Sequence, residues 1–114
     1  MPDTKLRCYV AGAESLLIHC AEALLQRGHT ICGVVTAAPQ LEGWARQAGL
    51  PVVAPGADLA ARLTEPFDYF FSITNLSMIR QDVLAKAHRG GINFHDGPLP
   101  RYAGLYVTAW ALIN

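Results

Sequence analysis

The sequence predicts an α/β fold built on a parallel sheet, and three observations support this prediction. Short apolar runs alternate with segments of helical spacing along all 114 residues. No repeat, low-complexity stretch or linker-like segment interrupts the alternation. The segment FDYFFSIT at 67–74 is almost wholly apolar and aromatic, which is typical of a parallel strand covered on both faces. Repeated β-α units with short loops imply right-handed crossovers and helices on both faces of the sheet, a Rossmann-like arrangement.

The first half of the chain holds two strands and two helices. LRCYVAG at 6–12 is expected to form a buried strand that runs into a glycine turn. AESLLIHCAEALLQRG at 13–28 is expected to be a helix that Gly28 ends. TICGVVT at 30–36 predicts a second strand, and QLEGWARQAG at 40–49 predicts a weaker helix that also ends at a glycine.

The second half continues the alternation. A short strand is expected at 50–55 and a helical turn or two at 56–64, before the apolar strand at 67–74. SMIRQDVLAKAHRG at 77–90 has its apolar residues spaced for a helix that packs on that strand. GINFH at 91–95 is then expected to be the fifth strand. Because ligands of such sheets bind beyond the carboxyl ends of the strands, functional residues are expected there.

Composition limits the size and the partners of the protein. A chain of 114 residues that is 52% hydrophobic can bury one core, so a single domain is expected over 1–114. Nine basic and nine acidic residues leave no net charge, which disfavours nucleic acid or an anionic membrane as a partner. The apolar runs fall short of the roughly 20 residues that cross a membrane, and the N-terminus has no apolar signal core. A cytoplasmic location is therefore expected.

The cysteines argue against a metal site, and the first glycine turn argues against a dinucleotide site. Cys8, Cys20 and Cys32 are odd in number, form no CxxC pair and lie in apolar segments, so buried thiols in a reducing cytosol are expected, and no metal site. The turn VAGAES has only one of the glycines of a dinucleotide fingerprint, and no acidic residue ends the second strand. A nicotinamide cofactor is therefore disfavoured.

The candidate site lies where the fifth strand ends. Side chains alternate across a strand, so Asn93 and His95 point to one side while Phe94 and Asp96 point to the other. An amide and an imidazole side by side at a buried strand end cost desolvation free energy unless they meet partners or a ligand. Asp96 fits an Asx-type turn as well as it fits catalysis. Gly97, Pro98, Pro100 and Gly104 shape the loop, and Arg101 and Tyr102 offer it polar contacts.

Other histidines and the tryptophans carry weaker signals. His19, His29 and His88 stand apart from any chemical pattern, so we interpret them as hydrogen-bonded residues of ordinary structure. Trp44 and Trp110 are interpreted as core residues.

The segment INFHDGPLPRYAGLYVTAWALIN resembles the active-site segment of the folate-dependent formyltransferases, the family of methionyl-tRNA formyltransferase and glycinamide ribonucleotide formyltransferase. The pattern of that family is Asn-x-His, then Leu-Pro, an Arg-Gly loop and a helix with a Trp. Asn93 and His95 fall on two of its three catalytic positions, and Leu99, Pro100 and Gly104 fall on its loop. The resemblance implies that 1–114 is the N-terminal part of a formyltransferase-like domain, truncated after the fifth strand.

The resemblance also implies a reaction, the transfer of a formyl group from 10-formyltetrahydrofolate to a primary amine. In that scheme Asn93 donates a hydrogen bond to the formyl oxygen and His95 stabilises the oxyanion. The loop that binds substrate or folate would comprise Asp96, Gly97, Leu99, Pro100, Arg101 and Gly104. The third catalytic residue of the family is an Asp that would follow Asn114, so catalysis by these residues alone is left open.

Three alternatives remain at this point. GPLP and RYAG stand where the family commonly has SLLP and Arg-Gly, and they look more like the formylation domains of some nonribosomal peptide synthetases. A second reading is that the chain keeps the fold as an inactive binding or regulatory module, and a third is that it binds nucleotides as an unrelated Rossmann-like domain. Among carboxylates that could replace the Asp, Asp68 is expected at the wrong edge of the sheet. Whether Glu14 or Asp58 could reach the site depends on loop geometry.

Self-association through the uncovered sheet edge is also expected.

Overall fold

A computed structural model of the chain describes residues 5–73 and 79–94. These residues form a five-stranded parallel sheet in the order β3-β2-β1-β4-β5. The strands are β1 (Arg7–Ala11), β2 (Thr30–Val35), β3 (Val52–Val53), β4 (Phe67–Ile73) and β5 (Ala87–Phe94), and the helices are α1 (Leu16–Gln26), α2 (Pro39–Gln47), α3 (Leu59–Arg62) and α4 (Gln81–Leu84). The predicted Rossmann-like parallel sheet is confirmed.

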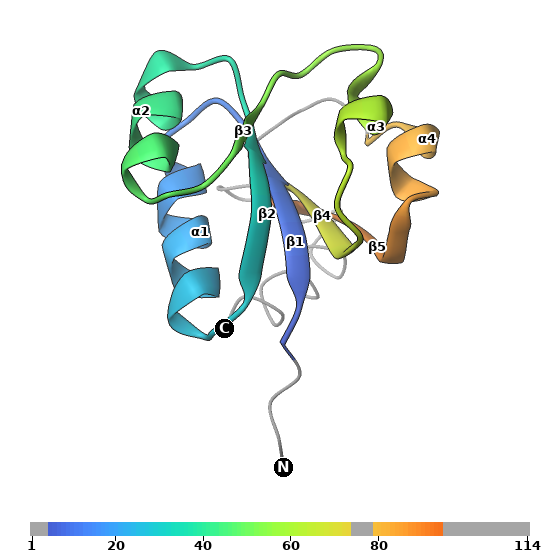
Figure 1. Ribbon diagram of the computed structural model, residues 1–114, viewed down its shortest axis with the longest axis horizontal. Coiled ribbons are helices and arrows are strands. Elements are labelled where there is room, and N and C mark those ends of the chain that lie inside the picture. The colour runs from blue at the N-terminus through green and yellow to red at the C-terminus, as the bar shows by residue number, and fades with distance from the viewer. Residues whose placement is uncertain (1–4, 74–78, 95–114) are drawn as a thin grey trace, which may run out of the picture.

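The helices cover the sheet in two layers. In Figure 1, α1 and α2 lie on one side of the strands and α3 and α4 lie on the other. The chain builds β1, β2 and β3 outward in one direction and then crosses to β4, which pairs with the other edge of β1. The order of the strands therefore reverses between β1 and β4, which is the usual position of a ligand crevice in an open α/β sheet.

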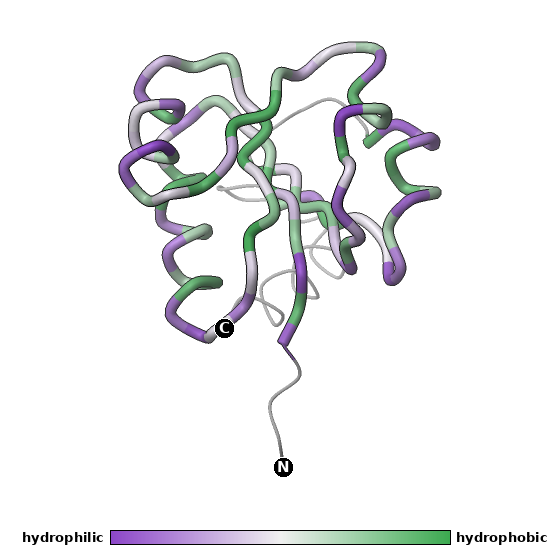
Figure 2. Tube along the Cα trace, in the orientation of Figure 1, coloured by the Kyte–Doolittle hydropathy of each residue, from purple (hydrophilic) through white to green (hydrophobic). Residues whose placement is uncertain are grey.

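Each layer buries its own apolar cluster against the sheet. Leu17 and Leu24 of α1 pack on the face that carries Val10 and Phe71. Figure 2 shows the apolar segments concentrated between the layers. On the opposite face Tyr9 meets Phe67 edge to face with 5.0 Å between the ring centroids, a favoured geometry for buried aromatic pairs.

The first helices begin and end as their sequences predict. The buried residues Leu17, Cys20, Ala21 and Leu24 recur at helical spacing along one face of α1. Gly28, at a φ of 84°, ends this helix. Beyond it, His29 Nδ1 accepts the backbone N–H of Leu6 at 3.0 Å, which confirms our interpretation of that histidine.

The region before β5 corrects the sequence prediction. The helix expected at 77–90 is wrong, because α4 covers only Gln81–Leu84 and β5 already begins at Ala87. Strand β5 pairs with β4 from Phe67 to Ile73, and this pairing satisfies backbone groups that a longer helix would have removed from the sheet. Gly90 has a φ of 134°, which a helix does not allow.

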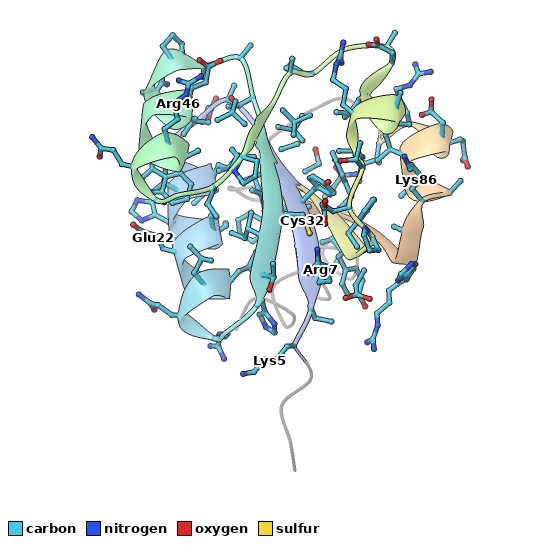
Figure 3. All side chains as sticks on the ribbon, viewed as in Figure 1. Lys5, Arg7, Glu22, Cys32, Arg46 and Lys86 are labelled. Atoms are coloured by element: carbon cyan, nitrogen blue, oxygen red, sulfur yellow. The ribbon has the colours of Figure 1, made fainter. Side chains whose placement is uncertain are left out.

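Gly91 lets the side chains of Leu84 and Ile79 pack directly against β5, because it has no side chain of its own. A Cβ atom at position 91 would lie 2.5 Å from Leu84 Cδ2 and 2.7 Å from Ile79 Cδ1. Lys86 Nζ then ties the segment to α3 by donating to the backbone oxygen of Ala60 at 2.6 Å, and Figure 3 shows Lys86 on this side of the molecule. The other predicted elements are present with changed bounds: α3 and β3 are much shorter than predicted, α2 begins one residue earlier, and β5 begins four residues before the predicted Gly91.

Three further expectations concern the described residues. Cys8, Cys20 and Cys32 are buried free thiols, as the sequence predicts. Within 5–73 and 79–94, no three His, Cys, Asp or Glu residues are grouped as metal ligands. No helix in those same ranges is long and apolar enough to cross a membrane.

Candidate functional site

A cavity of about 680 Å³ opens at the carboxyl ends of the central strands. The ends of β1, β2 and β4 form its floor, and the loop before α3 together with the start of α4 forms its walls. Its location is therefore the point where the strand order reverses, as expected for this type of sheet. Its main lining residues are Ala11, Gly12, Glu14, Val35, Thr36, Gly56, Leu59, Phe70, Ser72, Ile79, Arg80 and Val83.

The turn between β1 and α1 depends on Gly12. Its backbone N–H donates to Val35 O at 3.1 Å, which holds the turn against β2. A Cβ atom at this position would lie 2.8 Å from the backbone oxygen of Ile73 and 3.2 Å from Leu17 Cδ1. Only a glycine lets the chain pass so close to β4, so the turn leaves the space above the sheet open.

Two buried polar residues interrupt the apolar floor. Thr36 is 2% exposed and Ser72 is 1% exposed. Thr36 Oγ1 accepts the N–H of Ala38 at 3.1 Å, an ST-type turn that leads into α2, where Pro39 takes the first helical position. The cavity therefore combines an apolar floor with a few polar groups, the usual composition of a small-molecule site.

Of the two charged residues that line the cavity in the described part of the chain, Arg80 forms an ion pair and Glu14 does not. Arg80 binds Asp82 through Nε at 3.2 Å and through Nη2 at 3.4 Å. This hydrogen bond holds the pKa of Asp82 below its usual value. Glu14, in the turn before α1, is exposed and has no basic partner among the described residues.

Asn93 lies next to the cavity floor on β5. Ser72 and Asn93 are paired in register, and paired residues of parallel strands direct their side chains to the same face of the sheet. The Oδ1 atom of Asn93 is buried and has no hydrogen-bond partner among the described residues. Leaving a buried acceptor unsatisfied costs about 1–3 kcal/mol, so this amide is a candidate for contact with a ligand.

Of the predicted site residues, the structure describes only Asn93. Asn93 takes the expected place at the carboxyl end of β5. The other predicted site residues lie outside the described ranges, namely His95, Asp96, Gly97, Leu99, Pro100, Arg101 and Gly104.

The three alternative carboxylates fall in different places. Asp68 lies at the amino-terminal edge, where its Oδ2 accepts the N–H of Arg7 at 2.9 Å, so the prediction that it lies at the wrong edge is confirmed. Asp58 pairs with Arg62 at 2.8 Å and does not line the cavity. Glu14 is the one carboxylate among the described lining residues.

Sequence reasoning missed Thr36, Ser72 and Arg80. Ser72 could have been found because it is a hydroxyl near the carboxyl end of an otherwise apolar strand. Thr36 is the last residue of the predicted second strand. No sequence pattern singled out Arg80. It lies at the cavity because α4 begins directly after it, at Gln81, and not at 77 as predicted.

The three thiols do not contribute to the site. Burial raises the pKa of Cys8 to about 12 and that of Cys20 to about 11, and it also raises the pKa of Cys32. Their thiolate forms are therefore disfavoured at neutral pH, which makes them poor nucleophiles.

Comparisons with known proteins support the fold. No family model matches the chain. One similar solved structure is a formyltetrahydrofolate deformylase from Pseudomonas putida KT2440, with a TM-score of 0.60, 18% identity and 98% of this chain covered. Another is L-tryptophan dehydrogenase from Nostoc punctiforme, with a TM-score of 0.57, 13% identity and 91% of this chain covered. The alignments span 46% of the deformylase and 32% of the dehydrogenase. At these identities the likeness shows the α/β fold alone.

Proposed function

We propose that the chain supplies the N-terminal part of a folate-dependent formyltransferase, which moves a formyl group from 10-formyltetrahydrofolate to a primary amine. The observation that carries this proposal is the buried Oδ1 atom of Asn93, which has no hydrogen-bond partner among the described residues and lies beside a cavity at the carboxyl edge of the sheet. Similarity to the fold of a formyltetrahydrofolate deformylase agrees with a formyl-handling site.

The described residues can be tested for their fit to a formyl donor. A formyl group needs a hydrogen-bond donor at its oxygen and a water-poor surface around it. The side-chain amide of Asn93 provides an N–H donor, and the adjacent floor at Phe70 and Ser72 is buried. These residues fit the group, and 10-formyltetrahydrofolate would supply the formyl carbon when bound.

Asn93 has two tasks in this scheme. Its Nδ2 donates a hydrogen bond to the formyl oxygen, where negative charge develops when the amine attacks. Its Oδ1, which has no described partner, is then free to accept an N–H from the amine and orient it. His95 adds a second donor to the oxyanion, and the loop with Asp96, Gly97, Leu99, Pro100, Arg101 and Gly104 contacts the folate. These later roles rest on the sequence resemblance.

The decisive experiment uses the chain together with the sequence that follows it in its gene. Purified protein receives 10-formyltetrahydrofolate and an amine, and the N-formyl product and free formate are measured separately. Asn93→Ala should lower the rate by about 10² to 10³, as expected for one lost oxyanion donor. Gln81→Ala, an exposed change on α4, is the matched control and should leave the rate unchanged.

Stability separates a catalytic role of Asn93 from a structural one. Because its Oδ1 is unpaired in the described part of the fold, Asn93→Ala should leave the unfolding midpoint unchanged or raise it slightly. Full formyl transfer by Asn93→Ala would overturn the assignment. Absence of both folate binding and product in the wild type would favour an inactive module, and binding of a dinucleotide in its place would favour the nucleotide-binding alternative.

A further inference from the structure

Ser72 places a buried hydroxyl at the cavity floor, and the roles proposed for Asn93 and His95 leave that hydroxyl unused. The residue is 1% exposed, lines the cavity and is paired in register with Asn93 of the neighbouring strand. Adjacent strands of a sheet lie about 4.8 Å apart. A hydroxyl and an amide at paired positions of one face can therefore reach hydrogen-bond distance through a change of side-chain rotamer.

Ser72 is the residue of the described sheet that is best placed to donate to the Asn93 side chain. On the same face Phe70 pairs with Gly91, and neither has a polar side-chain atom. The other buried hydroxyl, that of Thr36, follows β2. The strand order β2-β1-β4-β5 puts three strand spacings, roughly 14 Å, between β2 and β5.

We propose that Ser72 is a positioning residue for Asn93, whose Oδ1 accepts a hydrogen bond from the Ser72 hydroxyl when the formyl donor is bound. The inference rests on the proposed function and deepens it, because it explains what directs Nδ2 rather than Oδ1 toward the formyl oxygen. Oδ1 has no partner among the described residues, and catalytic hydrogen bonds often tighten only in the complex with substrate.

The two ends of the Asn93 amide differ in what they can do at the formyl group. Nδ2 donates and Oδ1 accepts, whereas the formyl oxygen only accepts. In the reversed orientation Oδ1 would face the oxygen on which negative charge develops, and the two acceptors would repel each other. Donation from Ser72 to Oδ1 holds the productive orientation, and it polarises the amide so that Nδ2–H becomes a stronger donor. Because an amide oxygen has two lone pairs, Oδ1 can accept from Ser72 and from the amine together.

A double-mutant cycle tests this role in the chain together with the sequence that follows it in its gene. Ser72→Ala should lower kcat for formyl transfer about threefold to tenfold, as expected for one neutral hydrogen bond. It should leave KM for 10-formyltetrahydrofolate unchanged, because the hydroxyl does not contact the donor. In the Asn93→Ala background the same change should cause no further loss, since the hydroxyl acts through the amide.

Two variants control for other effects of the substitution. Ser72→Thr keeps the hydroxyl and suits a strand, so it should restore most of the kcat that Ser72→Ala loses. Ser15→Ala makes the same chemical change at an exposed position before α1, where the side chain caps no helix N–H and does not line the cavity. It should leave kcat unchanged. Circular dichroism should show that every variant is folded.

A second measurement needs no turnover. The side-chain NH2 signals of Asn93 are identified by their absence in Asn93→Ala and are followed by two-dimensional NMR while 10-formyltetrahydrofolate is added without an amine. These signals should shift in the wild type and in Ser72→Thr. In Ser72→Ala they should shift by no more than about half as much, because the amide is less polarised and is not held in one orientation.

Several outcomes would overturn the inference. They are an unchanged kcat in Ser72→Ala, an equal loss from this change in the Asn93→Ala background, or Asn93 signals that do not respond to the donor or respond equally in the wild type and Ser72→Ala. A response that depends on Ser72 without any N-formyl product would support the role of Ser72 and refute formyl transfer. Full formyl transfer that is insensitive to Ser72→Ala would do the reverse.

Discussion

Gly12 offers the sharpest test of how the turn between β1 and α1 keeps the cavity open. In Gly12→Ala the new Cβ would lie 2.8 Å from the backbone oxygen of Ile73. That oxygen belongs to the last residue of β4, a strand paired on both sides, so it cannot move aside as the end of a flexible side chain could. The φ of Gly12 does not lie in the left-handed region, so the clash alone accounts for the effect.

The expected loss of stability follows from the contact between the new Cβ and the Ile73 oxygen. Overpacking a close-packed site typically costs about 1–3 kcal/mol, and a contact with backbone places Gly12→Ala toward the upper part of that range. For a domain of this size, 1 kcal/mol corresponds to about 4 °C in the melting temperature. We therefore expect Gly12→Ala to lower the melting temperature by about 8–12 °C.

Gly43→Ala is the matched control for the same chemical change. A Cβ atom at Gly43, in the exposed middle of α2, would meet no atom within 4 Å. Alanine is the better helix former, so this variant should be more stable than the wild type by about 0.5–1 kcal/mol. Both variants are compared with the wild type by thermal unfolding and by urea unfolding, each followed by circular dichroism. The packing argument fails if Gly12→Ala is as stable as the wild type, or if the two variants change stability in the same direction.

Two further predictions concern the thiols and the sheet edge. The raised pKa values of Cys8 and Cys20 mean that the folded protein keeps these protons above pH 9 while the unfolded chain loses them, so stability should fall as the pH rises from 9. Urea midpoints at pH 8 and pH 10 should show this loss, and Cys20→Ala should reduce it; an equal loss in that variant would exclude Cys20 as a source. No described strand pairs with the outer edge of β5, so we expect association between copies. A single monomeric species throughout a dilution series in sedimentation velocity would refute this.

The sequence predicts much of the fold because most elements carry local signals that tertiary contacts reinforce. The period of Leu17, Cys20 and Leu24 matches the single buried face of α1, and Gly28 takes the left-handed conformation at its end. β4 is mostly apolar and aromatic because both of its faces are covered. Each of these patterns is compatible with only one type of secondary structure, so the element could be predicted from it.

The start of β5 could not be predicted in the same way. AHRGG contains no alternation of apolar and polar residues, and its place in the sheet is fixed by the register with Phe67 and Tyr69 of β4. That information lies twenty residues away along the chain and depends on pairing rather than on propensity. The apolar spacing between 78 and 84 favoured a long helix locally, and the sheet overrode it.

The sequence predicted a ligand site at the carboxyl ends of the strands, but it could not predict the lining of the cavity, which depends on the unequal lengths of the helices. At about 1.5 Å per residue, the four residues of α3 or α4 span roughly 6 Å, whereas the seven residues of β4 span roughly 23 Å at 3.3 Å each. Two such short helices cannot cover the whole of that face. The longer helices α1 and α2 cover the other face of the sheet. Among the described residues, the carboxyl ends of the strands are therefore left open on the face that carries Ser72 and its partner Asn93, and a substrate is expected to bind on that face.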